Sequence, residues 1–98
     1  MTEYLVRLVT SLPGDWSDEQ RRALLEREAA RGAELREAGT IAALWRLPGR
    51  LANVGIWRAE TPAALHEAIT SLPAWPWMAV EVTALAGHPL FAGRMLFV

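Results

Sequence analysis

The chain has 98 residues, of which 52% are hydrophobic and 21% are charged. This length and composition predict one globular domain and exclude a disordered segment. The net charge is −1, all 10 basic residues are arginines, and there is no cysteine. We therefore expect no basic face for nucleic acid, and we exclude a lysine Schiff base, a thiolate nucleophile and a zinc–thiolate site.

The sequence also indicates where the protein works. No apolar run approaches the ~20 residues that a membrane-spanning helix needs. The first residues, Met1 to Tyr4, show no basic segment followed by an apolar one, so we expect no signal peptide. These features predict a cytoplasmic protein with no membrane partner. His66 and His88 lie far apart in a chain without cysteine, so we expect no metal.

The first part of the chain predicts a strand followed by a long helix. Residues 3–10 are rich in β-branched and aromatic types, which favour a strand. Ser17, with Gln20 three residues later, has the pattern of a capping box, which predicts a helix over about 18–38. Gly39 fits the position just after the helix, where a left-handed backbone is common.

One stripe of this helix carries a carboxylate among apolar residues. Leu24, Leu25, Gly32 and Leu35 share the stripe at helical spacing, and Glu28 lies between them. We interpret Gly32 as a point where the helix approaches its neighbour closely. A carboxylate on such a stripe loses hydration, which raises its pKa toward the range useful for acid–base catalysis.

The remaining elements complete a known order. They are two strands, a helix and a last strand, expected over residues 40–47, 52–59, 62–72 and 78–84. Pro48 and Gly49 fit the centre of a type II turn between the two strands. The order β-α-β-β-α-β predicts an α+β, ferredoxin-like fold, with an antiparallel four-stranded sheet and two helices on one face.

Both faces of this sheet carry apolar residues. Tyr4, Val6 and Leu8 alternate along the first strand with Leu5 and Val9. A sheet that is apolar on both faces needs a second layer, and a second copy of the chain is the simplest one. We therefore predict a homo-oligomer.

The C-terminal end has its own pattern. We assign residues 1–89 to the domain and residues 90–98 to an apolar tail that ends in Met95-Leu96-Phe97-Val98. Because exposing such a segment to water is unfavourable, we expect the tail to dock on its own subunit or on a neighbour.

Short segments in a fixed order carry a resemblance to a known family. They are Tyr4-Leu5-Val6-Arg7, Glu28, Leu44-Trp45-Arg46, Gly49, Ala52-Asn53, Leu65-His66, Leu72-Pro73, Pro76, Met78, Glu81-Val82 and His88-Pro89. Together they resemble the muconolactone Δ-isomerase family over residues 1–89. The resemblance implies dimeric α/β barrels assembled into a decamer. It also implies cofactor-free isomerisation of muconolactone to an enol-lactone, in the β-ketoadipate route of bacterial aromatic catabolism.

The chain departs from the family at several positions. Many members have Tyr where this chain has Trp77, Ser in place of Gly55, and a Phe-Asp pair where this chain has Trp57-Arg58. These changes leave open a related isomerase or cyclase that acts on a bulkier, polyketide-like intermediate. A non-catalytic small-molecule-binding or assembly module is a further alternative, because ferredoxin-like dimers host many functions.

The implied reaction needs a base and a group that stabilises an enolate oxygen. We expect Glu28 to be the base, unless it merely pairs with an arginine, and His66 to be the next candidate. Arg7 and Arg46 lie mid-strand, where a guanidinium suits a substrate carboxylate, and Arg46 also suits the enolate. The alternative is an ion pair with Glu81 or with a partner subunit.

Four further residues are candidates for substrate binding. Asn53 can hydrogen-bond the small-molecule substrate or cap the nearby turn. Trp45, Trp57 and Trp77 can line a pocket, although aromatic residues pack in a core or an interface more often. A histidine beside a helix stripe, such as His66, is also more often a packing residue.

Overall fold

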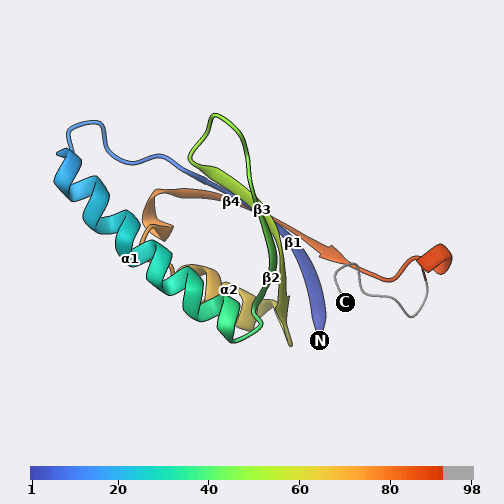
Figure 1. Ribbon diagram of the computed structural model, residues 1–98. Helices are drawn as coiled ribbons and strands as arrows, with labels where there is room; N and C mark the ends of the chain where they lie inside the picture. The colour runs from blue at the N-terminus through green and yellow to red at the C-terminus, as the bar shows by residue number, and fades with distance from the viewer. Residues whose placement is uncertain (92–98) are drawn as a thin grey trace.

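Two helices lie on one face of a four-stranded antiparallel sheet in the computed structural model, which describes residues 1–91 (Figure 1). The elements are β1 (Thr2–Thr10), α1 (Asp18–Glu37), β2 (Ile41–Arg46), β3 (Ala52–Ala59), α2 (Pro62–Thr70), the 3-10 turn η1 (Trp75–Trp77), β4 (Met78–Leu85) and the 3-10 turn η2 (Pro89–Phe91). The strand order is β2-β3-β1-β4. The predicted ferredoxin-like α+β fold is confirmed.

Both ends of α1 form as the sequence predicts. The Gln20 N–H donates to Ser17 Oγ at 3.1 Å, and the Ser17 N–H donates to Gln20 Oε1 at 2.7 Å. At the other end Gly39 has a φ of +81°, and the Thr40 N–H donates to the Leu35 carbonyl at 2.9 Å. These contacts satisfy backbone groups that a helix end leaves open, so they fix where α1 begins and ends.

The core lies between the helices and the sheet face that they cover. Its buried residues are Tyr4, Val6, Leu8, Leu35, Ile41, Trp57, Ala59, Leu65, Ile69 and Leu72. On α1 only Leu24 and Leu35 are buried, and Leu25 is exposed, so the buried stripe of the helix is narrower than the sequence predicted. Figure 1 shows the reason: α1 meets the sheet mainly through its C-terminal half.

The strand register decides which side chains face the helices. Tyr4 is opposite Trp57, and Leu8 is opposite Asn53, so β1 and β3 direct these four side chains toward α1 and α2. The opposite surface, which we call the open face, carries Leu5, Arg7, Trp45, Val54, Arg58 and Glu81. On this face Arg58 Nε donates to Glu3 Oε2 at 3.1 Å.

The β2–β3 turn and the chain end complete the fold. Gly49 has a φ of +76°, as a type II turn requires at this position. Beyond β4, η2 stands away from the helices, and its Leu90 and Phe91 are exposed (Figure 1). The tail end Met95 to Val98 lies outside the described residues, so its docking stays a prediction. No helix among residues 1–91 is long and apolar enough to cross a membrane.

Two glycines on or next to α1 have opposite roles, and alanine substitutions separate them. Gly39→Ala places a Cβ on a left-handed residue, so we expect a loss of about 1–2 kcal/mol in the free energy of unfolding. Gly32→Ala adds a Cβ in mid-helix with no atom within 4 Å, so we expect a gain of about 0.5–1 kcal/mol. Urea unfolding of both variants measures this. Equal changes in the free energy of unfolding for the two variants would contradict the assignment of Gly39 to the end of α1.

Candidate active site

A pocket of about 520 Å³ lies between α1 and the helix-facing side of β2 and β3. Its chemically distinctive lining residues are Glu28, Gly32 and Arg36 from α1 and Asn53 and Trp57 from β3. Most of the rest are alanines and leucines. This combination of an apolar wall with a few polar groups is typical of a small-molecule site.

Glu28 lies half-buried in the pocket wall and is held by one backbone hydrogen bond. The Ala74 N–H donates to Glu28 Oε1 at 2.9 Å. Burial raises the pKa of Glu28 above its ordinary value of 4.5, and the hydrogen bond from Ala74 partly counters this rise. Among the described residues, then, the partner of Glu28 is an amide and not the arginine of our alternative interpretation.

The amide that holds Glu28 is available because of the local sequence. The 3-10 turn η1 begins just after Ala74, and the Trp77 N–H donates back to the Ala74 carbonyl at 2.9 Å. Ala74 itself has an exposed fraction of 0%, so its own N–H needs a protein acceptor. Glu28 supplies that acceptor from α1. The hydrogen bond therefore joins α1 to the α2–β4 connection.

Two further lining residues leave a buried polar atom unsatisfied. Asn53 Oδ1 and Trp57 Nε1 have no hydrogen-bond partner within residues 1–91. One atom is an acceptor and the other is a donor. Such atoms are uncommon in folded proteins, and in a pocket wall they indicate where a bound molecule completes the hydrogen bonding.

Arg36 is a lining residue that the sequence analysis missed. It follows Glu28 by eight residues, with Gly32 midway, so all three lie along one face of α1. The four-residue spacing from Glu28 through Gly32 is the signal in the sequence that marks Arg36, whereas Arg7 and Arg46 stand out more because they lie mid-strand among apolar neighbours. Gly32 also corrects an expectation: an added Cβ meets nothing within 4 Å, so this glycine leaves space and does not permit close packing.

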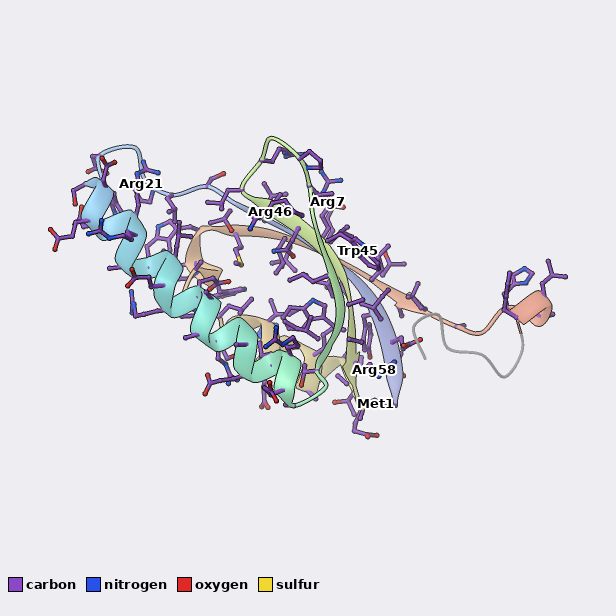
Figure 2. All side chains as sticks on the ribbon, viewed as in Figure 1. Met1, Arg7, Arg21, Trp45, Arg46 and Arg58 are labelled. Atoms are coloured by element: carbon purple, nitrogen blue, oxygen red, sulfur yellow. The ribbon has the colours of Figure 1, made fainter. Side chains whose placement is uncertain are left out.

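The predicted strand residues divide between the two faces of the sheet. Arg46 is opposite Asn53 in the register, so it shares the pocket's side of the sheet, although it is exposed and is not part of the lining. Figure 2 shows Arg46 on the side toward α1, with Arg7 and Trp45 on the opposite side. Arg7 is opposite Glu81, yet no ion pair joins these two described residues.

The last two predicted residues lie outside the pocket lining. His66 is exposed on α2 and meets the Trp75 ring edge-on, with 6.5 Å between ring centroids. Trp77 packs edge-to-face on Trp16, with 4.8 Å between the ring centroids. Their roles in catalysis and binding stay predictions. The described residues also hold no group of three or more His, Asp or Glu side chains arranged for a metal ion.

Comparison with known proteins gives one consistent result. The family model described as "Muconolactone delta-isomerase" matches residues 2–90. The chain is 39% identical to "Muconolactone Delta-isomerase 2" of Acinetobacter lwoffii over 85% of this chain and 86% of that protein. It is 31% identical to the Rhodococcus opacus "Muconolactone Delta-isomerase" over 90% of this chain and 95% of that protein. A crystal structure of muconolactone isomerase superposes on this chain with a TM-score of 0.86 at 29% sequence identity. The superposition covers 95% of this chain and 97% of that one.

The Glu28 hydrogen bond and the Glu28 charge have separable effects on stability. Burial raises the pKa of Glu28 in the folded protein above its ordinary value of 4.5. The free energy of unfolding should therefore decrease as the pH rises from about 4.5 through the higher folded-state pKa, because the buried carboxyl must then ionise. Glu28→Gln keeps an acceptor for Ala74 but has no charge, so it should lack this pH-dependent loss. Glu28→Ala leaves the buried Ala74 N–H unpaired and should lose about 1–3 kcal/mol. Urea unfolding at acid and neutral pH tests both, and equal stability of the two variants would exclude the hydrogen bond's role.

Proposed function

Because the chain belongs to the muconolactone delta-isomerase family, we propose that it is an isomerase that moves a proton within a small unsaturated lactone such as muconolactone. This role places it in the breakdown of aromatic compounds. The observation that carries the proposal is the half-buried Glu28 carboxylate, with its raised pKa, in the wall of the pocket.

In the proposed reaction one carboxylate both removes and returns a proton. Ionised Glu28 takes a proton from the allylic carbon next to the double bond, and the electrons of that carbon–hydrogen bond spread through the double bond onto the lactone carbonyl oxygen, which forms an enolate. Protonated Glu28 then delivers the proton to a different carbon, and the double bond shifts, so that no atom is gained or lost. Since Ala74 holds Oε1, the second oxygen, Oε2, is the atom that carries the proton.

The raised pKa suits this step. A carboxylate with a higher pKa is a stronger base, and a general base works best when its pKa is near the working pH. The enolate needs hydrogen-bond donors in a site shielded from water, where such bonds are stronger. We assign this role to the Trp57 indole N–H, which is buried and has no hydrogen-bond partner among residues 1–91. The unpaired Asn53 Oδ1 is an acceptor, so it does not serve the enolate oxygen.

The volume of the pocket favours a second candidate function. The pocket volume of about 520 Å³ lies within the range of pockets that bind drug-sized ligands. A bulkier lactone or a polyketide-like substrate is therefore the second candidate. Of the departures from the family, Trp57 bears on this choice, since it lines the pocket. Arg58 pairs with Glu3 on the open face, and Trp77 packs against Trp16.

We further propose that the chain works as a homo-oligomer, with the open face covered by a second copy, and the family resemblance implies a decamer. Leu5, on the inner strand β1, and Trp45, on the edge strand β2, are 38% and 46% exposed, and together they leave large apolar side chains uncovered on this face. The cytoplasmic location stays a prediction.

Light scattering tests the assembly. Burial of the open face predicts a particle of at least twice the mass of one chain at micromolar concentration. Leu5→Glu, which places a charge in that contact, should shift the particle toward the monomer. A wild-type monomer would contradict the proposed assembly.

The proton shuttle is tested on muconolactone itself. Glu28→Gln keeps the shape of the side chain but does not accept the proton, so kcat should fall by about 10²–10⁴-fold with little change in substrate affinity. In the wild type the rate should fall as the pH drops through the raised pKa of Glu28, above 4.5, because only the ionised form accepts a proton. Glu28→Gln should lack this acid limb. Wild-type turnover in Glu28→Gln would place the base elsewhere, with His66 next.

A further inference from the structure

We propose that the α1 face formed by Glu28, Gly32 and Arg36 is the substrate cradle: the lactone ring lies over Gly32, and Arg36 binds a carboxylate on the lactone's short side chain. This inference rests on the proposed function. It names the residues of this chain that hold the ring and the carboxylate of such a substrate.

The charge pattern along α1 supports the cradle. Glu28, Gly32 and Arg36 follow at intervals of four residues, so they line the pocket from one end to the other. Eight residues at 1.5 Å each separate Glu28 from Arg36 by about 12 Å along the helix axis. Both side chains are long enough to lean toward a ligand between them. The pocket thus has a base at one end and a cation at the other.

Gly32 supplies the space for the ring. An added Cβ at this position meets no atom within 4 Å, so the helix surface is open between the two charged residues. Ala29 and Ala33 keep the neighbouring lining small as well. A glycine in mid-helix costs stability relative to alanine, and here no close packing partner accounts for it.

Arg36 is better placed than the other candidate arginines. It is the basic residue of the described lining, whereas Arg46 lies further along the sheet and Arg7 lies on the open face. The ion pair of Arg36 with Glu37 is long, 3.8 Å, and both side chains are more than 70% exposed. Such a pair is weak, so Arg36 can turn to a ligand carboxylate, which a guanidinium binds with two parallel hydrogen bonds.

A pair of matched ligands tests the role of Arg36 without turnover. One is the saturated γ-lactone with a carboxymethyl side chain, which has no double bond to shift, and the other is its carboxamide. By calorimetry the wild type should bind the acid at least about tenfold more tightly than the amide. Arg36→Ala should bind both ligands equally, with its affinity for the amide unchanged. Arg27→Ala, on the opposite side of α1, is the control and should keep the full preference.

Gly32 gives an independent test of where the ring lies. Gly32→Leu introduces a good helix former whose Cβ meets no atom, so the chain should fold normally by circular dichroism. Its side chain fills the hollow, and binding of both ligands should fall by more than tenfold. Gly32→Ala should keep most of the binding.

The possible outcomes separate this inference from the proposed function. If Arg36→Ala still binds the acid more tightly than the amide, the role of Arg36 is overturned. If Arg46→Ala loses this preference instead, the substrate carboxylate is bound by Arg46. Normal binding by folded Gly32→Leu overturns the cradle. Glu28→Gln should keep the acid preference while it loses turnover. If Glu28→Gln keeps turnover, the proposed proton shuttle is wrong, whatever the binding results show.

Discussion

The hydrogen bond from the Ala74 N–H to Glu28 Oε1 ties together parts of the molecule that are distant in sequence. Glu28 lies in the middle of α1, and Ala74 lies in the connection between α2 and β4. The buried amide needs an acceptor, and the carboxylate needs a donor, so each satisfies the other in a place that water reaches poorly. The bond also sets how the carboxylate is presented: one oxygen is held, and the other is available to a ligand. The proposed base is therefore oriented by the same contact that joins α1 to the end of α2.

The pocket exists because α1 covers the sheet incompletely. A helix with a broad apolar stripe packs closely along its whole length, but α1 buries only Leu24 and Leu35. Between these two residues its inner face is small or polar, and the opposing strands do not fill the gap. The alternation of the strands completes the arrangement, since Trp57 and Asn53 face this gap while their neighbours Arg58 and Val54 face the open side. One sheet thus carries the proposed ligand site on one face and the proposed subunit contact on the other.

The elements could be predicted from the sequence because their signals are local. Ser17 with Gln20 and the left-handed Gly39 determine α1 without any tertiary information, and the strands follow from side-chain type. Glu28 was predictable because a charge within an apolar stripe is conspicuous. The face that Arg7 and Trp45 occupy was harder to infer, because a shift of one residue in register reverses it. Arg36 was missed because an exposed arginine near a helix end looks like an ordinary solvated residue until the strands opposite it are known.

Local features that cost stability converge on the pocket. The carboxylate of Glu28 is desolvated, a glycine lies in the middle of α1 at position 32, and the buried Trp57 N–H has no protein partner within the described residues. Each of these departs from what a sequence selected for stability alone would contain, and elsewhere the caps, turns and core follow such rules closely. A ligand that accepts a hydrogen bond, carries a ring and presents acidic carbon–hydrogen bonds would compensate all three in one place. The clustering of these costs, more than any single residue, is the physical argument for proposing this pocket as the site of the chemistry.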